Sequence, residues 1–209
     1  MPLKEAAERC TSSRPDGGPD AKRMLTQAIN DEILDACRGG DAEAFRVLFD
    51  SYKDRVYSIA LGFFNGDDAV AKDVMQLVFM KLMTHIGQFE KRSEFSTWLY
   101  RLVTNACLDQ KRARRRFLFF GSVRDLDAVD RRASAETRFI AHEMEAEIRS
   151  AIAGLKPKLR MAVLLKYFDD LSYEEIAAAL GCSKGTVASR LNRGHQILAR
   201  KLSHLRGVM

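Results

Sequence analysis

Apolar residues recur at intervals of three and four positions through most of this chain, and no segment shows sustained alternation of polar and apolar residues. Such intervals place side chains on one face of a helix, whereas alternation would favour a strand. One stripe contains Phe45, Leu48, Phe49, Tyr52, Val56 and Ile59. The next contains Val70, Val74, Leu77, Val78, Leu82 and Ile86. The chain is therefore predicted to be all-α.

Changes in residue composition divide the chain into four parts. Residues 1–23 are polar and rich in Pro and Gly, which predicts a flexible arm. Residues 24–116 form a first helical domain, in which Asn65-Gly66 ends one helix and Asp67 and Asp68 begin the next. Residues 117–135 change from apolar to mixed charge and predict a linker, and residues 136–209 form a second helical domain.

Charge is distributed unevenly between the two halves. The whole chain carries 34 Lys and Arg against 28 Asp and Glu, a net charge of +6. Residues 1–95 hold 13 basic and 16 acidic side chains, and residues 96–209 hold 21 and 12. The basic half indicates a polyanionic partner such as nucleic acid, and a solvated basic surface is the alternative.

A helix-turn-helix pattern lies near the C-terminus. Ser172 and Glu175 have the spacing of a capping box, Gly181 suits a tight turn, and Ser183 can cap a second helix. The exposed positions of that helix are phosphate and base-edge donors: Lys184, Thr186, Ser189, Arg190, Asn192 and Arg193. The pattern predicts DNA binding, and a helical hairpin with a solvated polar face is the alternative. Cys182 is expected to fill the turn, because no cysteine in the chain has the spacing of a zinc site.

Three strings of residues occur in a specific order. They are Asp73-Val74-Met75-Gln76, Phe95-Ser96-Thr97-Trp98-Leu99 and Gly185-Thr186-Val187-Ala188-Ser189-Arg190-Leu191. With these strings the chain resembles an extracytoplasmic-function (ECF) sigma factor of bacterial RNA polymerase. The resemblance implies two DNA-reading domains with no catalysis and no cofactor. It also implies binding to the β′ clamp and β flap of core polymerase, and regulation by an anti-sigma factor in the cytoplasm.

The resemblance also implies a role for particular residues. The first domain would contact polymerase through Asp73, Gln76, Leu77 and Met80, although the family usually has an acidic residue where Leu77 stands. It would recognise and open the minus-ten promoter element through Lys91, Arg92, Arg101, Asn105, Asp109 and Arg112. The second domain would read the minus-thirty-five element. Ala188 and His195 stand there in place of the family's usual basic residues, which predicts an altered sequence preference.

Several alternatives remain at this stage. The chain could be a helix-turn-helix regulator that binds DNA without polymerase, or a metal-dependent nuclease using Asp67, Asp68 and Asp73. Trp98 could stack on a base, although its spacing favours the core. The basic run Lys111–Arg116 is expected to meet phosphates or to be solvated. The apolar run Phe117–Phe120 is expected to pack on the first domain, in polymerase or under an anti-sigma factor. No apolar run is long enough to span a membrane, and no secretory signal is expected.

Overall fold

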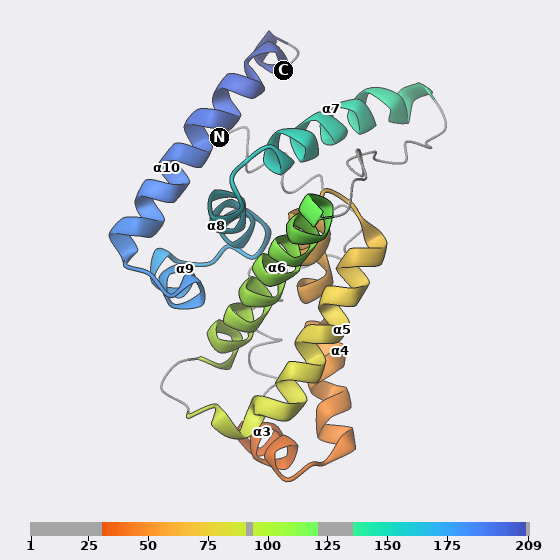
Figure 1. The fold of residues 1–209 in the computed structure, drawn as a ribbon, viewed down its shortest axis with the longest axis vertical. Helices are drawn as coiled ribbons and strands as arrows, with labels where there is room; N and C mark the ends of the chain where they lie inside the picture. Colours follow the sequence, from red (N-terminus) through yellow and green to blue (C-terminus); the bar gives the residue numbers. More distant parts are fainter. Residues whose placement is uncertain (1–30, 91–93, 121–135, 208–209) are drawn as a thin grey trace.

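The computed structural model describes residues 31–90, 94–120 and 136–207, and within these ranges it is helical with no strand. The all-α prediction is therefore confirmed. The elements in order are α3 (Asp31–Arg38), α4 (Ala42–Phe63), α5 (Asp68–His85), the 3-10 helix η1 (Ile86–Gln88), α6 (Phe95–Phe120), α7 (Glu136–Ala153), α8 (Pro157–Phe168), α9 (Tyr173–Leu180), α10 (Lys184–Lys201) and the 3-10 helix η2 (Ser203–Gly207) (Figure 1). We call α3–α6 the first unit and α7–η2 the second unit.

The ends of α4 and α5 follow from local capping chemistry. The carboxylate of Asp41 accepts hydrogen bonds from the backbone amides of the first turn of α4. The chain leaves α4 through Asn65 and Gly66, both with positive φ, as expected for a left-handed helix end. Asp67 then accepts the amide of Val70 at 3.1 Å and caps α5. These three features confirm the predicted helix break.

An aromatic cluster fills the connection between α5 and α6. Phe89 is buried, and its ring centroid lies 5.6 Å from both Phe95 and Trp98. Trp98 is partly buried within this cluster, which confirms that it packs in the core. Lys91 and Arg92 lie outside the described residues.

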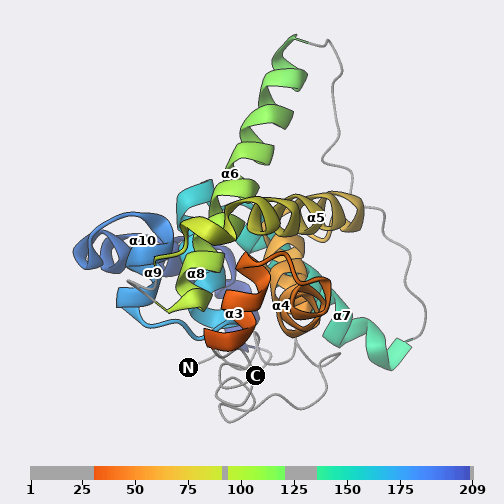
Figure 2. The same cartoon turned by 90° about the horizontal axis from the view of Figure 1, so that it is seen from below.

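Two details differ from the sequence prediction. Helix α6 continues to Phe120 through the first four residues assigned to the linker, and its C-terminal part projects beyond the bundle (Figure 2). Phe117 is 75% exposed there, so its side chain does not pack on the first unit. Phe49 was expected in the core but is 37% exposed, lying against the buried Phe79 with 4.7 Å between ring centroids. It covers the edge of the core rather than filling it.

The second unit contains the predicted helix-turn-helix as α9 and α10. Both halves of the Ser172–Glu175 capping box are formed at the start of α9. Gly181 has a left-handed conformation with φ of 59°, and Ser183 accepts the amide of Thr186 at the start of α10. Pro157 opens α8, where its missing N–H costs no hydrogen bond.

The two units pack against each other through α6 with α9 and α4 with α8. Buried Arg160 of α8 donates to the carbonyl of Phe63, the last residue of α4, at 2.6 Å. This bond satisfies a carbonyl that a helix end leaves without a partner. Beside it, a Cβ built on Gly62 would lie 3.0 Å from a methyl of Leu164, so the two helices approach closely here. One continuous set of buried residues therefore runs through both units.

Candidate nucleic-acid and polymerase interfaces

Helix α10 presents most of the residues predicted to read DNA. Lys184, Ser189, Asn192 and Arg193 are exposed. Lys184 forms an ion pair with Glu174, which lowers the pKa of that carboxyl group. Because both side chains are largely exposed, the pair contributes little stability, and Lys184 can exchange it for a phosphate.

Two of the predicted DNA residues on α10 are instead partly buried. Thr186 takes part in the helix cap, and its hydroxyl lies 2.9 Å from that of Ser183. Arg190 lies against the turn, with Nη1 3.4 Å from Sγ of Cys182. The Cys182 side chain is itself partly buried, as its predicted role in the turn requires.

His195 faces the inside of the second unit. Its Nε2 lies 2.8 Å from the hydroxyl of Tyr167 on α8, and burial lowers the pKa of the imidazole. A neutral ring is therefore favoured at the position where the family resemblance implies a basic residue, and α10 carries one cation fewer on this side. The sequence alone could show the replacement but not its contact with Tyr167.

Helix α6 carries the second predicted DNA surface. Arg101, Asn105, Asp109 and Arg112 are all exposed and follow one another at helical spacing along one face. Asp109 pairs with Arg112 at 2.9 Å, an exposed contact that orients the guanidinium group. The opposite face of α6 is buried in the core. The structure therefore brings these four predicted residues together on one surface.

The basic run after this surface is not uniformly free for phosphate. Arg114 is partly buried and donates to the carboxylate of Asp67, the cap of α5, at 2.9 Å. Its role is to tie α6 to α5, so the prediction that the whole run meets phosphate or solvent is corrected at this residue. Arg112, Arg115 and Arg116 remain exposed.

Helix α5 presents the residues predicted to contact polymerase. Asp73, Gln76 and Met80 are exposed, and Leu77 is partly buried beside them. Met80 is 57% exposed and Met83, one turn further, is 58% exposed. Met83 was missed by the sequence reading, although its spacing from Met80 places it on the same strip. An exposed pair of methionines beside polar groups is typical of a protein-binding surface.

The carboxylates of the nuclease alternative have other contacts. Asp67 caps α5 and pairs with Arg114, while Asp68 accepts the hydroxyl of Tyr57 at 2.6 Å and pairs with Lys72. The Asp68 bond raises the pKa of Tyr57 to about 12. No set of three potential metal ligands occurs within the described ranges. Asp67 and Asp68 are therefore engaged in helix capping and in contacts with neighbouring side chains, whereas Asp73 lies exposed on α5.

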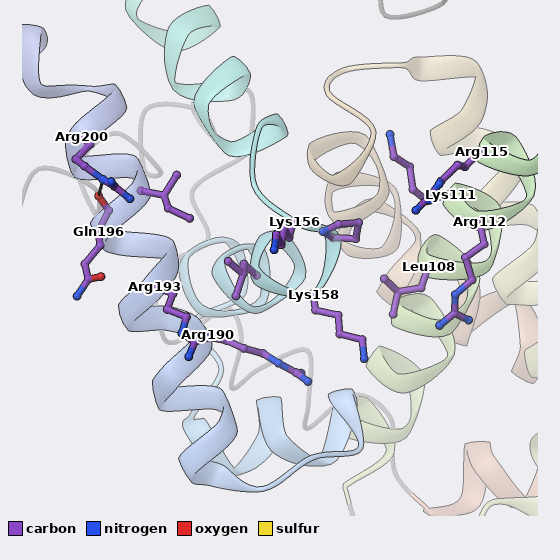
Figure 3. Close-up of a pocket in the computed structure, with 13 residues that line it drawn as sticks. Leu108, Lys111, Arg112, Arg115, Lys156, Lys158, Arg190, Arg193, Gln196 and Arg200 are labelled. Atoms are coloured by element: carbon purple, nitrogen blue, oxygen red, sulfur yellow. Dashed lines mark hydrogen bonds between the residues drawn. The ribbon is translucent and has the colours of Figure 1, made fainter. Parts of the chain in front are cut away.

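Three of the predicted DNA residues share one cleft. Arg112 of α6 and Arg190 and Arg193 of α10 line the space between these helices, with the start of α8 at its centre (Figure 3). The two predicted DNA surfaces thus lie next to each other in this arrangement.

None of the helices in the described ranges is both long and apolar enough to cross a bilayer.

Comparison with known proteins gives matches in both units. Residues 48–117 match the family model for sigma-70 region 2, and residues 145–198 match that for sigma-70, region 4. The RNA polymerase sigma-H factor of Pseudomonas aeruginosa is 32% identical, over 87% of this chain and 98% of that relative. The ECF RNA polymerase sigma factor SigW of Bacillus subtilis is 31% identical, over 79% of this chain and 92% of that relative.

Solved structures share the fold at lower sequence identity. The sigma factor RpoE of Bartonella quintana, in complex with the anti-sigma factor NepR, matches with a TM-score of 0.64 and 23% identity, over 78% of this chain and 98% of that one. CnrH, in complex with the cytosolic domain of CnrY, matches with a TM-score of 0.61 and 23% identity, over 82% and 96% of the two chains. With sequence relatives above 30% identity along most of its length, the chain belongs to the ECF family of RNA polymerase sigma factors.

Proposed function

We propose that this sigma factor binds the clamp of core RNA polymerase through α5, reads and opens the minus-ten element through α6, and reads the minus-thirty-five element through α10. The observation that carries the proposal is that one chain presents three exposed helix faces of suitable chemistry. The α5 strip combines Asp73 and Gln76 with two exposed methionines, which suits a protein partner. The faces of α6 and α10 combine arginines with asparagines, which suits DNA.

A regulator that binds DNA without polymerase is the second candidate. It would account for α9 and α10 but would have no use for the exposed strip on α5 or the polar face of α6. The matches to both sigma regions also favour the polymerase-dependent function.

Reading both promoter elements requires the two units to separate. The elements are named for positions that lie about 25 base pairs apart, which corresponds to about 85 Å of B-form DNA. A compact chain of this length is only about 45 Å across. With the α6 and α10 surfaces side by side, the packed arrangement cannot span a promoter. We therefore assign it to the sigma factor before it engages DNA.

An anti-sigma factor is the proposed regulatory partner. The RpoE and CnrH structures that share this fold each contain another protein, described for RpoE as an anti-sigma factor. Phe117 offers an exposed apolar side chain at the projecting end of α6, where a protein partner could cover it.

Run-off transcription with core polymerase on fragments of the source genome tests the proposal. The protein is expected to produce discrete transcripts that core polymerase alone does not make. Substituting Asn105 and Arg101 by Ala should reduce initiation and strand opening while leaving core binding unchanged. Substituting Ser189 and Asn192 by Ala should weaken upstream binding, at about 1–3 kcal/mol for each lost base contact.

The two candidate functions give different results in this assay. If the protein protects DNA in a footprinting assay but neither binds core polymerase nor yields a transcript, it has the second candidate function. The sigma assignment of the three surfaces then fails. Arg46→Gln serves as a control, because this exposed residue lies on α4 outside all three surfaces.

A further inference from the structure

The cleft between α6, α8 and α10 exists only because the two units pack together. It has a volume of about 810 Å³, within the range of small-molecule sites. Of the 13 residues that line it, eight are Lys or Arg and none is Asp or Glu. Both units contribute to this cationic lining, so it is a property of the packed chain rather than of either DNA surface.

The lining includes five basic residues besides the three assigned to promoter DNA. Lys111 and Arg115 come from α6, Lys156 and Lys158 from the start of α8, and Arg200 from α10. In Figure 3 Lys158 and Arg190 extend into the space between α10 and α6. Among the described residues, Arg112 is the one cleft cation with an ion-pair partner, the exposed Asp109. Within the described ranges, no acidic side chain forms an ion pair with the remaining cations of the cleft.

The N-terminal end of α8 adds to the positive potential. Lys156 is the cap residue and its side chain makes no capping hydrogen bond. Pro157 has no amide hydrogen, and the amides of Leu159 and Arg160 donate to the carbonyl of Lys156 at 2.9 and 3.0 Å, which leaves the Lys158 amide for a ligand. The positive end of the helix dipole lies in the cleft. The positive end of a helix dipole together with lysine and arginine side chains favours phosphate groups.

Packing the units together brings like charges into one cleft, which opposes the closed arrangement unless an anion neutralises them. We propose that this cleft binds an oligophosphate anion, a short chain of linked phosphate groups, and that the bound anion stabilises the packed arrangement of the two units. A chain of phosphates supplies several negative charges within a small volume. Duplex DNA carries its phosphates on the outside of a wide helix, which fits the open faces of α6 and α10 better than a cleft of this volume. The lining also includes the apolar side chains of Leu108 and Leu159, which a nucleoside attached to the phosphate chain could contact.

An effect of the bound anion on promoter binding rests on the proposed function, but the binding of the anion to the cleft does not. Arg112, Arg190 and Arg193 would contact either the anion or promoter DNA. A bound oligophosphate would then compete with the promoter and also hold the units too close together to span it. The test below uses the purified full chain without polymerase or promoter, so its failure leaves the proposed function untouched.

Calorimetric titration with inorganic tripolyphosphate, at fixed ionic strength, tests the site directly. We expect one tripolyphosphate anion to bind per chain. We expect that sulfate at the same ionic strength does not displace it. Lys156→Gln with Lys158→Gln should weaken binding at least tenfold, whereas Arg46→Gln with Lys72→Gln, a control of equal charge outside the cleft, should not. Arg115→Gln on α6 repeats the test from the other unit, and circular dichroism verifies that each variant is folded.

A second variant tests dependence on packing without removing charge. Gly62→Leu places a side chain against Leu164 between the units and should also weaken tripolyphosphate binding. ATP, without added metal, identifies the source of the phosphates. Tighter binding of ATP than of tripolyphosphate indicates a nucleotide, and equal binding indicates an inorganic chain.

Four results would overturn the proposal. The first is binding no stronger than that of sulfate, and the second is equal weakening in the cleft and control variants. The third is unchanged binding in a Gly62→Leu chain whose radius of gyration has increased, and the fourth is tighter binding of a single-stranded oligonucleotide with the same number of phosphates. The last result would identify the cleft as part of a nucleic-acid surface.

Discussion

The carboxylate of Asp67 contacts two elements of the first unit. One oxygen accepts the amide of Val70 and caps α5, and the other accepts the guanidinium group of Arg114 on α6. Both partners of the ion pair are about one-third exposed, so solvent weakens it. The cap is therefore the larger contribution to stability, and the ion pair determines how the end of α6 is held.

Substitutions at Asp67 separate these two contributions. Asp67→Ala removes both contacts and should lower the free energy of unfolding by about 1–2 kcal/mol. Asp67→Asn keeps a capping oxygen but loses the charge, and should cost less than about 1 kcal/mol. Urea unfolding followed by circular dichroism measures both values. Equal losses in the two variants would show that the ion pair, rather than the cap, dominates.

His195 makes the stability of the second unit depend on pH. Burial lowers the pKa of its imidazole in the folded chain, so the unfolded chain binds the proton more strongly. Stability is then complete above the ordinary histidine pKa of about 6.5 and decreases as the pH falls through the lowered folded pKa. Unfolding measured at pH 7.5 and at pH 5.5 should show a smaller loss in His195→Gln than in the unsubstituted chain. An identical loss in both would assign the pH dependence to other groups.

At the scale of helices and turns, ends governed by local chemistry could be predicted from the sequence. The caps Asp67, Ser172 and Ser183 and the turn glycine Gly181 act within a few residues of their own position. Features that depend on distant segments could not be predicted. Arg114 and Asp67 are 47 residues apart in the sequence. Their pairing could be predicted only from the knowledge that α6 lies beside the start of α5.

The same distinction applies to the candidate sites. The spacing of Arg101, Asn105 and Asp109, which the family resemblance singled out, predicts that they share one face of a helix, and all three are exposed on α6. Burial of Arg190 and His195 depends on how α10 lies against its neighbours, which residue order within α10 does not specify. The proximity of the α6 and α10 surfaces depends on packing between the two units, which no local pattern in the sequence indicates.

The exposed strip on α5 should contribute to polymerase binding through its apolar groups. Met80→Ser with Met83→Ser removes two exposed thioethers and should leave the folded chain stable, since neither side chain is in the core. If polymerase covers them, binding should weaken at least tenfold, because full burial of a methionine contributes about 1.5–3 kcal/mol. Affinity for core polymerase can be measured by fluorescence anisotropy. Val47→Ser, a similarly exposed apolar position on α4, is the control, and an equal effect there would argue against a specific role for the strip.

At the scale of the whole molecule, a continuous buried core and several polar contacts hold the two units together. Arg160 of the second unit donates a hydrogen bond to the end of α4. Tyr100 of α6 lies near Asp169 of the second unit; burial raises the pKa of the Tyr100 hydroxyl, and the charge of Asp169 raises it further. Gly62 permits the close approach of α4 to α8. If the packed arrangement precedes promoter binding, the energy of these contacts must be overcome whenever the units separate. Apparent affinity for a promoter is then reduced by the fraction of chains that are closed.

Gly62→Leu should shift this balance without touching a DNA surface. Leucine favours a helix more than glycine, so α4 itself should gain stability, while the new side chain collides with the fully buried Leu164. The radius of gyration from small-angle X-ray scattering should increase. Promoter affinity in the presence of core polymerase should rise about tenfold for each 1.4 kcal/mol of lost packing energy. Gly87→Leu is the control for compactness, because a Cβ there meets no atom within 4 Å. An expanded variant with unchanged promoter affinity would show that separation of the units does not limit promoter binding. A variant that stays compact would show that the interface repacks around the added side chain.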